Sequence, residues 1–229
     1  MGAALQVPSL RLYYGGTFDP IHEGHLAIAR AARDGLSAAV HLVPAADPPH
    51  RAPPGASAGL RAQMVALAVA DEAGLMLDEI EIERARHHPG RPSYTVDTLA
   101  QLRQDLGPDV PLAWLIGGDS LGSLERWHQW ERLFALAHIV VVDRPGSALP
   151  PILPPHLAAV VQGSRWCTDA GQLQAVPAGL LYALPMPLRN ESSTAVRARL
   201  AAGQTVSGWV APAVARFIAG HRLYGVHGS

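Results

Sequence analysis

The sequence contains no lysine, since each of its 18 basic residues is an arginine. A cationic side chain that holds a phosphate must therefore be an arginine or a protonated histidine, and the lysine of a Walker-type phosphate loop is excluded. Cysteine is nearly absent as well, and the single Cys167 cannot form a disulfide within the chain. Because there is also no apolar run of 18 residues and no charged-then-apolar leader, we expect a protein of the reducing cytoplasm without a membrane span.

A surplus of positive charge is missing too. The formal net charge of the 229 residues is −1, and the pI is about 6.8. These values argue against the large basic footprint that duplex nucleic acid requires, although they allow a mononucleotide as ligand. With 48% apolar and 16% charged residues, the chain can fill a substantial core by itself. The sequence leaves association into a homo-oligomer open.

Strand patterns alternate with helix patterns along the chain. Apolar runs predict strands over residues 10–14, 38–43, 111–116, 139–142 and 180–186. Helical spacing predicts helices that begin after Pro20, after a Ser57 cap, at Ser93 or Thr95, after Ser192 and at Pro212. We therefore expect an α/β fold, a Rossmann-like open and mostly parallel sheet with helices on both faces, in a single domain over residues 1–229.

Three segments depart from this simple alternation. Residues 75–83 alternate apolar and acidic side chains, which predicts an edge strand or an extended segment, and residues 84–92 form a basic segment with Pro and Gly that we expect to be a solvated loop. Residues 145–179 are rich in proline, and only a short helix or strand near residues 157–161 is indicated there.

The segment 15–25, which reads GGTFDPIHEGH, lies between the first strand and the first helix. A glycine turn lets backbone N–H groups approach a phosphate, and the helix directs its positive end to the same place. His22 and His25 are three residues apart, so both imidazoles lie on one helix face. A surface pair or a helix cap is the default interpretation of two such histidines, but the preceding GGTFDP sequence favours an anion site.

Other chemistries lose their support at this turn. It matches neither G-x-G-x-x-G nor the Walker pattern, and a zinc helix places its histidines four apart with a neighbouring Glu and a third ligand. We therefore expect no protein-held metal. A second glycine turn at 117–120, the segment 48–51 and the cap at 192–194 also follow strands, so all four share the edge at which an open α/β sheet binds ligands.

The segment 15–25, together with 192–197 (SSTAVR), resembles the paired signatures of the nucleotidyltransferase superfamily with an H-x-G-H motif. Within it the chain is similar to the bacterial nicotinate-nucleotide adenylyltransferases, because segments 48–51, 93–95, 118–120, Trp127 and 144–146 follow in that family's order over about residues 11–225. The resemblance implies that ATP and nicotinate mononucleotide are joined to give deamido-NAD and pyrophosphate by direct in-line attack, with Mg²⁺ carried on the ATP.

The resemblance also implies the site residues. His22, His25 and Arg197 would be catalytic. The ATP site would consist of Gly15, Gly16, Thr17, Phe18, His22, His25, Gly118, Asp119, Ser193, Thr194 and Arg197. The mononucleotide site would consist of Gly16, Thr17, Phe18, Arg51, Tyr94, Thr95, Trp127, His128 and Arg144.

Structural alternatives stand beside several of these roles. Trp127 could be core packing, Asp119 a helix N-cap, and Ser93 and Thr95 caps. Two positions depart from the family pattern: Ala45 and Ala46 replace a polar pair, and Glu191 stands where an isoleucine is usual. The alternative functions are an adenylyltransferase for nicotinamide mononucleotide or phosphopantetheine, a related cytidylyltransferase, and a nucleotide sensor without catalysis.

Overall fold

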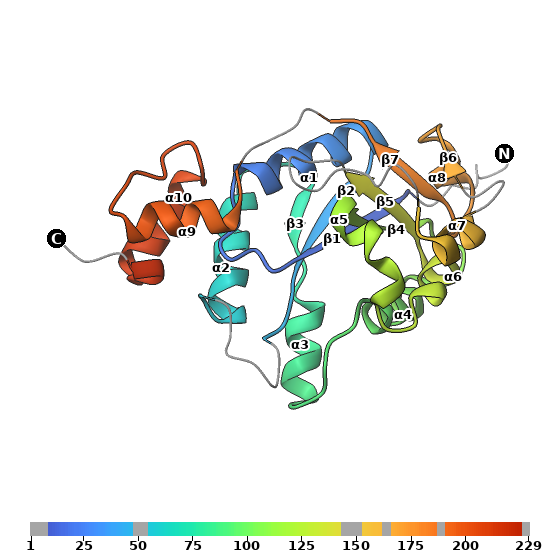
Figure 1. Cartoon of the computed structure of the whole chain (residues 1–229), viewed down its shortest axis with the longest axis horizontal. Coiled ribbons are helices and arrows are strands. Elements are labelled where there is room, and N and C mark those ends of the chain that lie inside the picture. The colour runs from blue at the N-terminus through green and yellow to red at the C-terminus, as the bar shows by residue number, and fades with distance from the viewer. Residues whose placement is uncertain (1–8, 48–54, 143–152, 162–165, 187–190, 226–229) are drawn as a thin grey trace, which may run out of the picture. The chain divides into compact units, whose positions relative to one another are not determined.

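A computed structural model describes residues 9–47, 55–142, 153–161, 166–186 and 191–225. The strands form a seven-stranded sheet with the order β3-β2-β1-β4-β5-β7-β6 (Figure 1). β2 with β3, β4 with β5, β5 with β7 and β6 with β7 pair in parallel. The Rossmann-like α/β class is thus confirmed. Arg51 and Arg144 lie outside the described residues, as do most of the segments around them.

The chain divides into two compact units. The first unit comprises residues up to Tyr13, Ala32–Ala39 and Tyr94–Pro185, and the second comprises Tyr14–Ala31, Val40–Ser93 and the residues from Met186 onward. Strand β1 (Arg11–Gly16) and helix α1 (Glu23–Leu36) each contribute residues to both. That residues 1–229 act as one domain stays a prediction.

The first unit has the most deeply buried strands. Its elements are α4 (Thr95–Leu106), β4 (Leu112–Gly117), α5 (Gly118–Gly122), η1 (Leu124–Arg126), η2 (Trp130–Arg132), α6 (Leu133–Leu136), β5 (His138–Val142), α7 (Pro155–Val161), β6 (Trp166–Cys167), α8 (Gln172–Ala175) and β7 (Leu181–Leu184). All five side chains of β5 are buried, and β4, β5 and β7 run side by side (Figure 1). Such continuous apolar runs are typical of strands covered on both faces.

Two polar side chains, the half-buried Arg103 and the buried His138, contact the loops that lead into these strands. Arg103 on α4 donates hydrogen bonds to the backbone oxygens of Gly107, Pro108, Val110, Leu136 and Pro177. The Nε2 of His138, at the start of β5, lies 2.9 Å from the backbone oxygen of Val176, and its Nδ1 accepts from Leu180 N–H at 3.1 Å. Burial lowers the pKa of His138, so the neutral ring is the form that fits this arrangement.

The second unit contains the two segments of the family signature. Its elements are β2 (Ala39–Pro44), α2 (Ala58–Val69), β3 (Leu75–Leu77), α3 (Ile80–His87), α9 (Ser193–Ala201), α10 (Pro212–Gly220) and η3 (Leu223–Gly225). Helix α10 packs against α2, and η3 packs against α9 and α10 (Figure 1). Among the described residues, no helix combines the length and the apolar character that crossing a membrane needs.

Most predicted elements are present, and several boundaries agree closely. Ser57 caps α2, Ser192 caps α9, and α10 has the predicted bounds 212–220. The open choice near residues 157–161 resolves as helix α7.

The edge strand predicted over residues 75–83 is wrong beyond Leu77, because the next turn is helical. Asp78 Oδ1 accepts from the Ile80 N–H at 3.0 Å, which starts α3. Acidic residues in its first turn and basic residues in its last turn match the helix dipole. The loop predicted over residues 84–92 is therefore also wrong for residues 84–87, which are helical.

The helix predicted to begin at Ser93 or Thr95 begins at Thr95, but none of the three residues given as alternative caps, Ser93, Thr95 and Asp119, is an N-cap residue. Helix α4 has Tyr94 as its N-cap residue, and no side chain caps it. The Ser93 hydroxyl instead accepts from Arg84 at 2.7 Å, and Thr95 is the first helical residue. The N-cap of α5 is Gly117, so Asp119 is not a cap either.

Candidate active site

The two glycines predicted to form a turn are the last residues of β1, and the turn follows at Thr17–Pro20. Phe18 has a positive φ of 50°, and a Cβ placed on Gly16 would lie only 2.9 Å from the Phe18 ring. The glycine at position 16 is therefore required by the close approach of this ring. A non-glycine residue in the left-handed region is a strained feature that clusters at functional sites.

The two histidines at the start of α1 are buried and stacked. Their ring centroids are 3.7 Å apart with an interplanar angle of 27°, and His22 and His25 are 3% and 9% exposed. A Cβ on Gly24 would lie 3.0 Å from the His22 ring and 3.1 Å from the Glu191 backbone oxygen. The glycine between the histidines thus allows both rings and the segment before α9 to pack together.

One hydrogen bond sets the orientation and the tautomer of His25. His22 is the residue before α1, and its N–H donates to His25 Nδ1 at 3.3 Å, which is one half of a capping box. Because Nδ1 is the acceptor, a neutral His25 carries its proton on Nε2. In this tautomer Nε2 of His25 is a hydrogen-bond donor, which suits an anion.

The two signature segments contact each other directly. Ser193 Oγ donates to the Pro20 backbone oxygen at 3.0 Å, and Arg197 Nη1 donates to the Asp19 backbone oxygen at 2.6 Å. The side chain of Arg197 is 36% exposed, and its Nη2 lies 3.4 Å from Thr194 Oγ1. The structure thus brings the turn, the histidines and the N-terminus of α9 into one group of hydrogen-bond donors.

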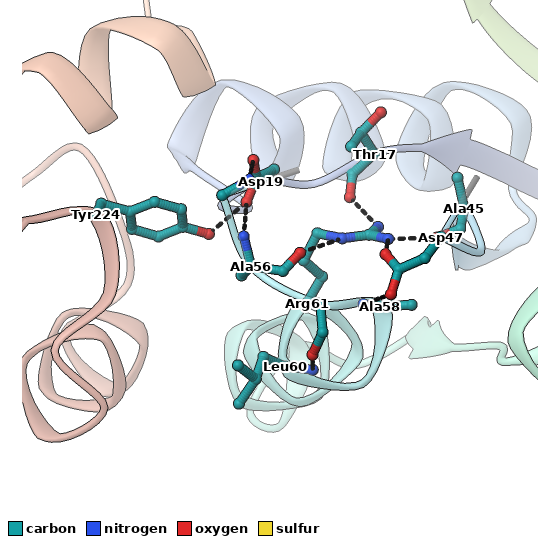
Figure 2. Close-up of polar contacts among 11 residues, drawn as sticks. Thr17, Asp19, Ala45, Asp47, Ala56, Ala58, Leu60, Arg61 and Tyr224 are labelled. Atoms are coloured by element: carbon teal, nitrogen blue, oxygen red, sulfur yellow. Dashed lines mark hydrogen bonds and ion pairs between the residues drawn. The ribbon is translucent and has the colours of Figure 1, made fainter. Parts of the chain in front are cut away.

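A fully buried arginine donates hydrogen bonds to the loops next to this group. Arg61 on α2 has no exposed surface, and its guanidinium donates to the backbone oxygens of Thr17 at 2.6 Å, Ala45 at 2.7 Å and Ala56 at 3.1 Å (Figure 2). The Asp47 carboxylate accepts from the same guanidinium at 2.9 Å. Arg61 therefore joins the glycine turn, the end of β2 and the start of α2.

Asp19 is a second centre of hydrogen bonds in the same unit. Its carboxylate is buried and accepts from the N–H groups of Gly55 and Ala56 and from the hydroxyl of Tyr224 (Figure 2). Asp19, Arg61 and Tyr224 are functional candidates that the sequence did not reveal. A charged residue on the otherwise apolar face of α2 was a usable signal for Arg61, whereas nothing in the sequence singles out Tyr224.

The first unit holds the other predicted site residues. Gly118 and Asp119 open α5 directly after β4, with Gly118 buried and Asp119 exposed. Tyr94 and His128 lie together, with ring centroids 4.4 Å apart and an interplanar angle of 33°. Trp127 is only half-buried, so core packing does not explain it. Thr95 is half-buried at the start of α4.

The departures from the family pattern have limited structural consequences. Ala45 uses its backbone, donating to the Gly16 oxygen at 2.9 Å and accepting from Arg61. Glu191 is half-buried, and its backbone oxygen lies against Gly24. Among the described residues, no three His, Cys, Asp or Glu side chains are grouped so that they could hold a metal ion.

Residues 13–199 match the model of the cytidylyltransferase-like family. The probable nicotinate-nucleotide adenylyltransferase of Stenotrophomonas maltophilia is 58% identical to this chain over 216 residues, which are 94% of this chain and 97% of that protein. The protein of the same name from Xylella fastidiosa is 46% identical over 221 residues, which are 96% of this chain and 99% of that protein.

A solved structure gives the same result for the fold. The nicotinic acid mononucleotide adenylyltransferase of Plasmodium falciparum, complexed with NaAD, superposes with a TM-score of 0.67 over 96% of this chain and 98% of that chain, at 16% identity. The resemblance seen in the sequence is confirmed. The chain belongs to the cytidylyltransferase-like family and, within it, to the nicotinate-nucleotide adenylyltransferases.

Proposed function

We propose that this protein joins ATP to nicotinate mononucleotide and releases pyrophosphate, giving deamido-NAD in the cytoplasm. An oxygen of the mononucleotide phosphate attacks the α-phosphorus of ATP, and the bond from that phosphorus to the bridging oxygen of pyrophosphate breaks. The nucleophile is an anion at neutral pH, so no general base is needed. The protein then acts by positioning the two phosphates and stabilising charge.

The observation that carries this proposal is the group of donors in the second unit. Arg197 is fixed on the turn through the Asp19 backbone oxygen, and a neutral His25 carries its N–H on Nε2 because its Nδ1 accepts from His22. We assign the α-phosphate to His22 and His25, whose hydrogen bonds strengthen as pyrophosphate departs. The hydroxyl of Thr194 and the guanidinium of Arg197 hold the β- and γ-phosphates, and the Ser193 hydroxyl joins them by giving up its hydrogen bond to the Pro20 backbone oxygen.

We assign Mg²⁺ to the triphosphate and not to a protein cage. The described residues of the turn and α9 offer donors, and the one buried carboxylate nearby, Asp19, already accepts three hydrogen bonds. Such residues fit a Mg²⁺ that is bound by phosphate oxygens and water. When bound, the ion neutralises phosphate charge.

The second substrate is assigned to the first unit and the turn. Trp127 is available to stack on the pyridine ring, and the half-exposed Tyr94 and His128 form an aromatic pair beside the start of α4. Backbone N–H groups near Thr95 and His128 receive the pyridine carboxylate. Gly118 and Asp119 receive the ATP ribose, while the mononucleotide phosphate is bound by the turn at Gly16–Phe18, with Arg51 and Arg144.

One assay tests this function. Purified protein is incubated with Mg-ATP and either nicotinate or nicotinamide mononucleotide, and the dinucleotide is followed by chromatography. We expect product with the acid and much less with the amide. A preference for the amide would contradict the substrate assignment alone. Absence of product with both mononucleotides would contradict the proposed reaction, and ATP binding without turnover would then indicate a sensor.

A further inference from the structure

Asp19 carries a buried negative charge next to the arginine that we assign to the triphosphate. Only 4% of Asp19 is exposed, and its Oδ2 lies 3.7 Å from Arg197 Nη1. That separation is too long for a hydrogen bond, and the same nitrogen donates to the Asp19 backbone oxygen. Arg197 therefore stands beside a carboxylate with which it does not pair closely, although two-pronged pairing is the geometry that arginine and carboxylate favour.

Three neutral donors satisfy the Asp19 carboxylate in place of Arg197. Gly55 N–H donates to Oδ2 at 2.8 Å, Ala56 N–H donates to Oδ1 at 3.1 Å, and the Tyr224 hydroxyl donates to Oδ1 at 2.6 Å (Figure 2). Hydrogen bonds to an ionised carboxylate disperse its charge and stabilise it in a buried position. The pull of Asp19 on Arg197 is therefore weakened.

The third of these donors comes from the distant C-terminal segment and is held under strain. Tyr224 has φ 60° and ψ 31°, a left-handed conformation that is unusual for an aromatic residue. Its ring packs so closely on Gly55 that a Cβ at position 55 would lie 2.7 Å from Tyr224 Cε1. Burial and the neighbouring Asp19 carboxylate raise the pKa of Tyr224, so the phenol keeps its proton and remains a donor.

The guanidinium of Arg197 has five N–H groups, and hydrogen bonds within the described part of the chain use two of them. We propose that Tyr224 is a positioning residue for ATP: by donating to Asp19, it keeps Arg197 on the Asp19 backbone oxygen and its outer edge directed at the triphosphate. Without the Tyr224 hydroxyl, Arg197 turns onto the Asp19 carboxylate and withdraws from ATP. This inference rests on the proposed function, in which Arg197 holds the β- and γ-phosphates.

Two substitutions break the hydrogen bond from the Tyr224 hydroxyl to Asp19 in different ways. Tyr224→Phe removes the hydroxyl alone, and Gly55→Ala keeps the hydroxyl but displaces the ring that carries it, so that the hydroxyl moves away from Asp19. We expect each variant to bind ATP about 10- to 100-fold more weakly in calorimetry without mononucleotide, the usual effect of losing a hydrogen bond to a charged group. In turnover, kcat/KM for ATP falls by the same factor, while the KM for the mononucleotide stays unchanged.

A double-mutant cycle tests whether Tyr224 acts through Arg197. We expect Tyr224→Phe to have almost no effect on ATP binding in an Arg197→Met background, because there is no guanidinium left to misplace. A merely structural role would weaken ATP binding by the same factor in both backgrounds. Equal factors would overturn the proposal.

The matched control is Tyr182→Phe, which removes a hydroxyl from another buried tyrosine, on β7 of the first unit. We expect its ATP affinity to be that of the wild type. Wild-type ATP affinity in a folded Tyr224→Phe variant would overturn the proposal. Loss of the fold in both Tyr224→Phe and Gly55→Ala would also overturn it. If the wild type binds ATP but makes no dinucleotide, the proposed reaction fails, and the calorimetric cycle still decides the role of Tyr224.

Discussion

Arg103 in the first unit and Arg61 in the second perform the same structural task on different segments. Each projects from a helix and donates to the backbone oxygens of several loops, five oxygens for Arg103 and three for Arg61. The loops bound by Arg103 lead into strands β4, β5 and β7. The loops bound by Arg61 follow strands β1 and β2, and one of them is the glycine turn.

This difference indicates which loops contribute to stability alone and which contribute to function as well. In open α/β sheets the ligand binds beyond the carboxyl ends of the strands. A residue that fixes the loops before the strands can stabilise the protein without affecting the chemistry. Arg61 fixes loops after the strands, so the same hydrogen bonds there should influence both. The two buried histidines, His138 and His25, allow the same comparison.

The largest expected effect is that of His25→Asn. The asparagine oxygen can still accept from the His22 N–H, but the Nε2 donor is lost. By analogy with the loss of one oxyanion-hole donor, we expect kcat to fall about 10²–10³-fold, equivalent to about 3–4 kcal/mol of barrier. Steady-state rates with saturating Mg-ATP and nicotinate mononucleotide measure this effect.

The same substitution at His138 is the control. His138→Asn keeps an acceptor for the Leu180 N–H and loses the contact to Val176. We expect lower thermal stability and an unchanged kcat. A comparable loss of kcat in folded His138→Asn would contradict the separation of the two roles.

The second-largest effect is expected from substituting Arg103 and Arg61 separately. We expect Arg103→Met to lower the free energy of unfolding by about 1–3 kcal/mol, because five part-buried or exposed backbone oxygens lose a hydrogen bond, and to leave kcat/KM unchanged. Arg61→Met should cost a similar amount and also reduce kcat/KM at least tenfold, because the Thr17 peptide is released. Urea unfolding and rates at a temperature where both variants are folded check this. Equal activity losses in the two variants would show that Arg103 influences the site as strongly as Arg61 does.

The sequence contained enough information for the fold and for the two segments of the candidate site that contact each other. Glycines, caps and apolar runs are local signals, so β1 and α1 could be placed from residues 10–33 and the start of α9 from residues 192–197. Residues 80–83 were misassigned because the alternation fits a strand, and residues 84–87 because the basic segment that follows contains Pro and Gly, whereas the hydrogen bond from Ile80 N–H to Asp78 starts a helix over 80–87. The local sequence pattern alone does not distinguish a strand from a helix here.

The supporting residues could not be predicted for a different reason. Tyr224 and Asp19 are 205 positions apart, and the value of their hydrogen bond depends on burial that only the folded chain creates. Arg61 shows the same limit, since its position on the apolar face of α2 signals an unusual residue without indicating which backbone oxygens it contacts. Direct phosphate ligands follow a motif, but the residues that position them follow the tertiary structure.

The stability of the protein should depend on pH through His138 in the first unit. Burial lowers the pKa of His138 in the folded protein, so the unfolded chain takes up this proton first as the pH falls below about 6.5. We expect the contribution of His138 to stability to be constant above that value and to decrease below it, by at most about 1.4 kcal/mol per pH unit, until the folded pKa is reached. Protonated Nδ1 can no longer accept from Leu180.

Urea unfolding between pH 7.5 and 5 of the wild type and of His138→Asn isolates the contribution of His138, because the two proteins differ at this residue alone. The difference in unfolding free energy between the two should shrink as the pH falls. A difference that is independent of pH would mean that the ring is already charged or is solvated in the folded state.

The smallest expected effect comes from two serine caps of the second unit. Ser192 Oγ accepts from Ala195 N–H at 3.2 Å at the start of α9, and Ser57 Oγ accepts from Leu60 N–H at 3.5 Å at the start of α2. We expect Ser192→Ala to cost about 1 kcal/mol of stability and Ser57→Ala about half of that, because its hydrogen bond is longer and Asp47 also caps α2 through Ala58 N–H. Only Ser192→Ala should raise the KM for ATP, about two- to fivefold, since the turn that it caps carries Ser193 and Thr194. An equal rise for Ser57→Ala would mean that the two caps support the site to the same degree, and that α2 acts on the phosphates through more than Arg61.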